Sequence, residues 1–308
     1  MLRFPRSGGA GIDTDARIPR APAHHHSRSN SHPYATTSRL PDVPQFTIIH
    51  SMVKKPITPD AQQLKQERVA KKQNYQQQLD AILTTVKREL GETQKKPSLL
   101  LHACCGPCSS YVIEYLAPYF DITIYYYNPN IFPPQEYERR LTELSFFLTD
   151  FDVSVFEKVT LVRAEYEPEA FYTATNVRHE PQLQREAERG ERCRRCYELR
   201  MTKAYQYAVE HHFDWFTTTL SISPFKDAEK INTIGKQLED RYRAAAATPV
   251  PRFLTSDFKK RGGFKRSLEL SREYDLYRQD YCGCEYSLQN TRREQNKTTE
   301  GAICRTAK

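Results

Sequence analysis

A short apolar segment at residues 99–103 constrains the fold of this chain more than any other feature. Its sequence, LLLHA, is of the kind found in a buried strand of a parallel sheet, and a turn containing Gly and Pro follows at once. A similar segment at residues 122–127 ends in an Asn-Pro-Asn loop. A helical segment that begins near Ser109 or Ser110 separates the two. The pattern predicts parallel strands joined by helices.

The alternation of strands and helices continues along the chain. We expect helices at residues 135–150, 193–212 and 226–239, and strands around Leu161 and Val162, in the segment DWFTTTLSIS and at residues 252–255. This order predicts an α/β fold, Rossmann-like, with a mostly parallel sheet and flanking helices. In such folds ligands bind at the carboxyl ends of the strands. Four segments follow predicted strands and should face one crevice: CCGPC, the Asn-Pro-Asn loop, residues 221–224 and residues 257–260.

Composition divides the chain into four parts. Residues 1–45 are rich in Ser, Pro, Arg, Gly and His, so we expect a disordered basic tail. Residues 46–95 form an N-terminal helical segment, because residues 61–90 lack Pro and Gly and carry apolar residues at helical spacing toward their end. Residues 96–287 form the α/β catalytic domain with the cysteine clusters, and residues 288–308 form a flexible basic tail.

Most of the net charge of +8 lies in these two tails. Each tail carries +3, which leaves +2 for the rest of the chain. Charge alone therefore leaves open whether the tails bind nucleic acid or are solvated ends. No apolar run approaches the ~20 residues of a membrane span, and no apolar segment follows the N-terminal arginines. We expect a cytoplasmic protein without a membrane partner.

Three groups of cysteines carry the chemistry that the sequence indicates. Eight cysteines in a long chain without a secretory signal favour metal or redox use over disulfides. Cys104, Cys105 and Cys108 lie at a strand-to-helix turn, where a helix N-terminus lowers the pKa of a thiol. Cys193 and Cys196 lie on one side of a predicted helical turn. With Cys104 and Cys105 they supply the four thiolates of a [4Fe–4S] cluster or a structural zinc, and the adjacent pair favours the cluster. We expect this iron–sulfur site at the carboxyl ends of the strands.

The third group, Cys282 and Cys284, has a single glycine between its members. A disulfide between them would close a very small, strained ring that is easily reduced. This spacing favours an electron relay or a metal clip, and a zinc-binding tail is the alternative.

The same residues carry a resemblance to a known family. Over roughly residues 74–287, the chain resembles the QueH-type epoxyqueuosine reductases. The matching stretches are LLLHACCGPCSSYVIEYL, YYYNPNIFPPQEYERRL, ERCRRCYELRM, FTTTLSISPFKDAEKIN and SDFKKRGGFKRSLELSREYDLYRQDYCGCEYS. The resemblance implies reduction of epoxyqueuosine to queuosine at the wobble position of tRNA, the final step of queuosine biosynthesis.

The resemblance also implies roles for the cysteines. The implied ligands of a [4Fe–4S] cluster are Cys104, Cys105, Cys193 and Cys196. Cys282 and Cys284 match a redox-active pair. The family further suggests an adjacent mononuclear metal, iron or zinc, and Cys108 is the residue that we place there.

Reduction of an epoxide to an alkene consumes two electrons and two protons and releases water. We expect the cluster to donate the electrons and an external carrier, such as ferredoxin or flavodoxin, to resupply them. Asp227, Asp257 and Tyr281 are candidate proton donors because they lie near the predicted crevice. Asp227 equally fits a helix cap, and Tyr281 fits packing beside the second cysteine pair.

A tRNA anticodon loop is single-stranded, so its recognition relies on aromatic stacking and on basic contacts to phosphate. The predicted RNA-binding residues are Lys259, Lys260, Arg261, Lys265 and Arg266, with Lys226 as a further cation. The aromatic candidates are Tyr125, Tyr126, Tyr127 and Phe132, and alternate tyrosines of this run equally fit the core of the sheet.

Two other functions stay open at this point. A tRNA sulfurtransferase would need a phosphate-binding SGGxD-like loop after the first strand, where this chain has CCGPC. A non-enzymatic, zinc-stabilised RNA-binding module would carry zinc and show no activity.

Overall fold

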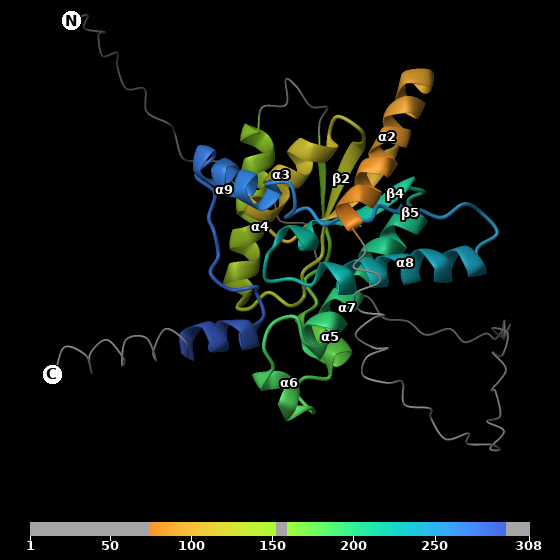
Figure 1. Cartoon of the computed structure of the whole chain (residues 1–308). Coiled ribbons are helices and arrows are strands. Elements are labelled where there is room, and N and C mark those ends of the chain that lie inside the picture. Colours follow the sequence, from red (N-terminus) through yellow and green to blue (C-terminus); the bar gives the residue numbers. More distant parts are fainter. Residues whose placement is uncertain (1–73, 152–158, 294–308) are drawn as a thin grey trace, which may run out of the picture. The chain divides into compact units, whose positions relative to one another are not determined.

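The computed structural model describes residues 74–151 and 159–293, which belong to one compact unit (Figure 1). Its centre is a five-stranded sheet in the order β3-β2-β1-β4-β5. The strands are β1 (Ser98–His102), β2 (Asp121–Tyr126), β3 (Thr160–Arg163), β4 (Trp215–Thr218) and β5 (Arg252–Phe253). Every neighbouring pair is parallel. The prediction of an α/β fold with a parallel sheet and flanking helices is confirmed.

Helices cover both faces of this sheet. Because successive residues of a strand point to opposite sides, neighbouring residues of one strand belong to different cores. Leu99 and Leu101 share a core with α2 (Tyr75–Thr93), α3 (Gly106–Leu116) and α4 (Pro134–Asp150). Leu100 shares a second core with α7 (Glu191–Glu210) and α8 (Ala228–Ala245) on the other face. Figure 1 shows these helices around the strands.

The tyrosines of β2 follow the same alternation. Tyr126 belongs to the first core, and Tyr125 and Tyr127 belong to the second. Tyr125 stacks on Tyr207 of α7 with ring centroids 4.6 Å apart. The core interpretation of these tyrosines is therefore correct, and their rings are not free to stack on RNA bases.

Several predicted boundaries are wrong by a few residues. α3 begins at Gly106 rather than near Ser109, because Pro107 fits the first turn of a helix, where its missing N–H costs nothing. β4 ends at Thr218, where the Thr218 hydroxyl accepts a hydrogen bond from the N–H of Leu220 and starts the 3₁₀ turn η1 (Thr219–Ile222). β5 has two residues rather than four.

Other elements were not expected from the sequence. These are α5 (Pro168–Thr175), α6 (Pro181–Arg185), α9 (Gly263–Glu273) and a helix at residues 285–293. The last helix contains residue 288, so the predicted flexible tail begins inside a helix. The predicted tail at 1–45, the helical segment before residue 74 and residues 294–308 lie outside the described residues. No helix of the described chain is long and apolar enough to cross a membrane.

The strand order places a topological switch point beside β1. The chain passes from β1 outward to β2 and β3, and then returns to β4 on the other side of β1. In open α/β sheets ligands bind at the carboxyl ends of the strands at such a point. The loops after β1 and β4, which contain CCGPC and residues 219–227, meet there.

Candidate functional site

The loop after β1 holds the first thiol group, Cys104, Cys105 and Cys108. Their Sγ atoms all lie within 4.8 Å of one another, a spacing that suits the ligands of one metal ion. In the described part of the chain this close group includes neither Cys193 nor Cys196. Hydrogen bonding with Cys105 lowers the pKa of Cys104 well below its ordinary value, and the same contact raises the pKa of Cys105 to about 11. Cys104 is thus the thiol of this group that loses its proton most readily.

The second thiol group combines the first turns of α7 with the CxC segment. Its members, Cys193, Cys196, Cys282 and Cys284, line one small buried cavity. The Sγ atoms of Cys282 and Cys284 are 3.9 Å apart. Hydrogen bonding with Cys284 and the charge of Lys226 lower the pKa of Cys282, whereas burial raises that of Cys193 to about 12. Cys282 is therefore the thiol of the second group that loses its proton most readily.

A tight turn at Gly283 positions this cysteine pair. Gly283 has a φ of +123°, a backbone conformation that other residues rarely adopt. The buried guanidinium of Arg140 donates to the carbonyl of Cys282 at 3.2 Å, and the N–H of Phe132 donates to the carbonyl of Gly283 at 2.8 Å. Side chains and backbone of the α4 region thus hold the turn against the sheet.

Two buried cations, Lys226 and Arg200, interact with both thiol groups. Burial lowers the pKa of Lys226, but the charges of Cys282 and Cys104 outweigh it and raise the pKa above its ordinary value. The charges of Cys196 and Cys104 do the same for Arg200. A cation that stays charged when buried needs nearby negative charge. The two cations therefore connect the thiol groups electrostatically.

The surroundings of the second thiol group fit an anionic metal cofactor. The Nε and Nη2 atoms of Arg192 and the Nε atom of Arg200 are buried without a hydrogen-bond partner among the described residues. Both arginines line the cavity that holds the four thiols. Unpaired buried N–H groups are costly, and a metal–thiolate group of negative charge would satisfy them. The cysteine set is therefore chemically suited to bind metal.

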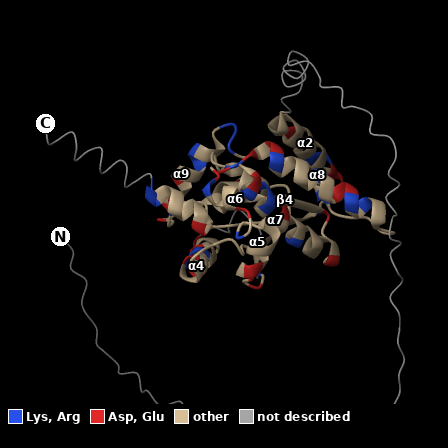
Figure 2. Cartoon of the chain, turned by 90° about the horizontal axis from the view of Figure 1, so that it is seen from below, with Lys and Arg blue, Asp and Glu red and all other residues tan. Residues whose placement is uncertain are grey.

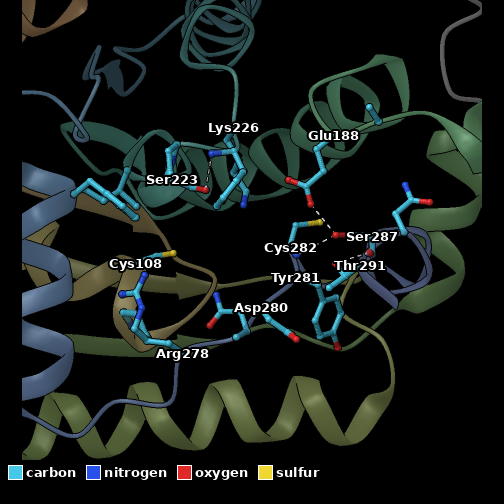
Figure 3. Close-up of a pocket in the computed structure, with 18 of the residues that line it drawn as sticks. Cys108, Glu188, Ser223, Lys226, Arg278, Asp280, Tyr281, Cys282, Ser287 and Thr291 are labelled. Carbon is cyan, nitrogen blue, oxygen red and sulfur yellow. Dashed lines mark hydrogen bonds between the residues drawn. The ribbon is translucent and has the colours of Figure 1, made fainter. Parts of the chain in front are cut away.

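A larger cavity of about 680 Å³, here called the open pocket, lies beside both thiol groups (Figure 3). Its volume is in the usual range for small-molecule sites. Cys108 of the first group and Cys282 of the second both line it. Cys282, Glu188 and Lys226 line the open pocket and the small thiol cavity alike. These three residues form the wall between the pocket and the buried thiols.

Glu188 is the carboxyl group of this wall. The Ser287 hydroxyl donates to Glu188 Oε1 at 2.7 Å and accepts from the N–H of Cys282 at 3.2 Å (Figure 3). Burial, followed by the negative charge of Cys282, raises the pKa of Glu188 above its ordinary value. A carboxyl group with a raised pKa, next to a redox-capable thiol, can donate a proton to a bound ligand.

The predicted proton donors have other positions. Asp227 caps α8, accepting hydrogen bonds from the N–H groups of Glu229 at 3.0 Å and Lys230 at 3.2 Å. Asp257 pairs with Lys259 at 2.5 Å. Neither aspartate lines the open pocket, so the cap interpretation of Asp227 is correct. Tyr281 does line the pocket, but its hydroxyl donates to the carbonyl of Phe132.

The predicted basic cluster is largely paired with acidic side chains. Lys259 pairs with Asp257, Arg261 with Asp80, Lys265 with Glu269, and Arg266 with Glu114. Figure 2 shows both positive and negative residues along α8 as well. None of the basic residues between 259 and 266 lines the open pocket. Lys226, expected to contact phosphate, is buried among the thiols.

Sequence reasoning missed Glu188, Arg200, Arg140 and Ser287 as parts of the site. Arg140, Arg200 and Ser287 lie within the stretches that resemble the family, but no residue type or spacing there indicated a role in the site, and Glu188 lies outside those stretches. Only the return of the segment around residue 282 to the carboxyl edge of the sheet brings them together. One available signal was the density of arginines around Cys193 and Cys196.

Comparison with known proteins places these residues in context. A family model described as epoxyqueuosine reductase QueH matches residues 99–290. A Streptococcus pyogenes serotype M1 protein named epoxyqueuosine reductase QueH is 39% identical over 208 residues, covering 68% of this chain and 77% of that protein. The protein of the same name from Staphylococcus epidermidis is 37% identical, covering 71% and 88%. That from Haemophilus influenzae is 35% identical, covering 74% and 86%.

Proposed function

Because the chain belongs to the epoxyqueuosine reductase QueH family and is an oxidoreductase, we propose that it reduces epoxyqueuosine to queuosine at the wobble position of tRNA, the final step of queuosine biosynthesis. One observation carries the proposal beyond the family name. Cys108 and Cys282, one from each thiol group, line the same open pocket as Lys226 and Glu188. Thiols, a fixed cation and a carboxyl group therefore surround the space where an epoxide would bind.

We assign the cofactor to the cysteines of both groups. Cys104, Cys105, Cys193 and Cys196 would hold a [4Fe–4S] cluster, and Cys108 would bind an adjacent mononuclear iron or zinc. The close triad supports a metal ligand at Cys108, and the unpaired N–H groups of Arg192 and Arg200 support bound negative charge near Cys193 and Cys196. The cluster would supply single electrons from an external donor, such as ferredoxin or flavodoxin.

In our proposal Cys282 and Cys284 supply the two electrons that reduce the epoxide. Oxidation of deprotonated Cys282 and protonated Cys284 to a disulfide forms one S–S bond and releases two electrons and one proton. Cleavage of both C–O bonds of the epoxide, with formation of the alkene and of water, consumes two electrons and two protons, so a second proton must come from another acid. The Sγ separation of 3.9 Å and the thiolate character of Cys282 support this role. The external donor then restores the thiols.

Glu188 supplies this second proton to the departing oxygen. Its carboxyl group lines the open pocket and is hydrogen-bonded to Ser287, whose hydroxyl also contacts the backbone of Cys282. Because burial raises the pKa of Glu188, the protonated form persists closer to neutral pH than in an ordinary glutamate. Lys226, next to the same pocket, stabilises the negative charge that develops on the oxygen.

The experiment uses anaerobically purified protein, a chemical reductant and tRNA that carries epoxyqueuosine. Nucleoside mass spectrometry should reveal loss of one oxygen with wild-type protein and at least a hundredfold slower loss with Cys282→Ser. Cys304→Ser, a cysteine substitution outside both thiol groups, is the control and should retain the activity. The same assay tests the alternatives, since a zinc-stabilised RNA-binding module or a sulfurtransferase would leave epoxyqueuosine unchanged. Metal analysis adds a second criterion, because the zinc-stabilised module would contain zinc rather than iron. Unchanged substrate with iron-loaded wild-type protein would refute the proposal.

A further inference from the structure

The mouth of the open pocket carries an unusually exposed aromatic ring, Phe225. Its side chain is 66% exposed, more than any other large hydrophobic residue in the described ranges. The ring is not on a loose loop, because the N–H of Phe225 donates to the Ser223 hydroxyl at 3.2 Å. Arg189 donates to the carbonyl of Pro224 and fixes the loop from the other side. The position is therefore held in place while the ring remains uncovered.

The neighbour of Phe225 ties the ring to the reaction centre. Lys226 is only 9% exposed, and it interacts with Cys282, Cys104 and Cys108. Its N–H donates to the carbonyl of Ser223 at 3.2 Å, which closes the turn (Figure 3). A planar ligand stacked on Phe225 would thus lie in the same pocket as Lys226, the next residue in the chain and the cation that interacts with the thiols.

The rim of the pocket also carries cations that have no acidic partner among the described residues. Arg185, Arg278 and Arg293 line the pocket and are exposed. Within residues 74–151 and 159–293 none of the three forms a salt bridge, and Arg278 donates only to the Ser271 hydroxyl at 3.0 Å. With Lys226, four cationic side chains stand against the two acidic ones, Glu188 and Asp280. The basic residues at 259–266, in contrast, are mostly neutralised by acids.

An exposed aromatic ring beside unpaired arginines is the combination that binds single-stranded nucleic acid. Bases stack on the ring, and the guanidinium groups meet the phosphates. We propose that the pocket rim is a nucleotide-binding site in which Phe225 stacks on an anticodon base adjacent to the modified nucleotide, while Arg185 and Arg278 contact the backbone phosphates. The proposal rests on the function proposed above, and it places RNA recognition at the pocket rather than at residues 259–266.

Fluorescence anisotropy with a labelled, unmodified anticodon stem-loop RNA tests this site in the full-length protein. Phe225→Ala should weaken binding about tenfold without changing its salt dependence, since stacking carries little electrostatic contribution. Arg185→Gln and Arg278→Gln should each weaken binding and reduce the slope of log K against log salt by about 0.7, the value for one phosphate contact to a single strand. Phe225→Trp should restore the affinity.

Two matched charge changes define the controls. Lys87→Gln removes an exposed cation of α2 outside the open pocket and should leave both affinity and slope unchanged. Lys265→Gln tests the alternative RNA-binding surface, the basic residues at 259–266. The inference is overturned if Lys265→Gln weakens binding more than Arg278→Gln, or if Phe225→Ala binds like wild-type protein. Because the RNA is unmodified, failure of epoxide reduction would leave this result unaffected.

Discussion

The turn between the two C-terminal cysteines leads to a sharp prediction for Gly283→Ala. A Cβ atom at this position would lie 3.0 Å from Ile131 Cγ1, 3.1 Å from Arg140 Nη1 and 3.2 Å from Asn130 Nδ2. Of these neighbours, Arg140 holds the turn through its hydrogen bond to the Cys282 carbonyl, and it is almost fully buried. The φ of +123° is unfavourable for alanine as well.

The magnitude follows from these two effects. Backbone strain costs of order 1–3 kcal/mol, and crowding by one methyl group adds about 1 kcal/mol or more. A total near 3 kcal/mol would lower the thermal midpoint by roughly 6–12 °C in a domain of this size. Displacement of Arg140 would also weaken its hydrogen bond to the Cys282 carbonyl, so epoxyqueuosine reduction should fall at least tenfold.

Circular dichroism melting of the reduced protein, together with the tRNA conversion assay, measures both effects. Gly262→Ala is the matched control, because Gly262 has a φ of +79° but nothing within 4 Å of its added Cβ. It should show strain alone and keep its activity. Gly91→Ala, in α2 with open space around it, should be neutral or slightly stabilising. If Gly283→Ala melts no lower than Gly262→Ala and stays active, the reasoning about this turn is wrong.

Three further predictions concern the charges and thiols of the site. Lys226→Met should raise the pKa of Cys282 toward its ordinary value, so that alkylation of this thiol, followed by mass spectrometry, requires a higher pH; an unchanged profile would contradict the assigned contact. Glu188→Gln should slow epoxide reduction about a hundredfold or more. Because the pKa of Glu188 is raised, we expect the wild-type rate to decline as rising pH deprotonates this residue, and the Gln variant should lack that decline; a variant with the pH–rate profile of the wild type would exclude Glu188 as the acid. Iron loading should protect Cys104, Cys105, Cys193 and Cys196 from alkylation while Cys282 stays reactive, whereas equal protection of Cys282 would assign it to the metal.

The fold was predictable because its signals are local. The apolar run before Cys104 and the alternation of strands and helices indicated a parallel sheet, and the structure has Leu99 and Leu100 in its two cores. CCGPC also follows β1 at the carboxyl edge of the sheet, as the sequence predicted. The predicted helix and strand boundaries were wrong where a single residue determines the end of an element. Pro107, for example, lets α3 begin earlier than predicted.

The composition of the site was less predictable because long-range contacts decide it. Nothing near Glu188 in the sequence indicates that Ser287 will donate to it across 99 positions. The charge of Lys226 was visible, but its burial among thiols was not, so it was expected at a phosphate. The cation run at 259–266 looked free because its partners, such as Asp80 and Glu114, lie far away in the sequence.

The most direct test of the account follows the oxygen atom of epoxyqueuosine in tRNA. Iron-loaded wild-type protein and reductant should convert epoxyqueuosine to queuosine, seen by nucleoside mass spectrometry as the loss of one oxygen. Cys282→Ser, loaded with the same amount of iron, should leave the epoxide intact. Conversion at the wild-type rate by the Cys282→Ser protein would contradict the claim that the Cys282–Cys284 pair beside the open pocket supplies the electrons for the reduction.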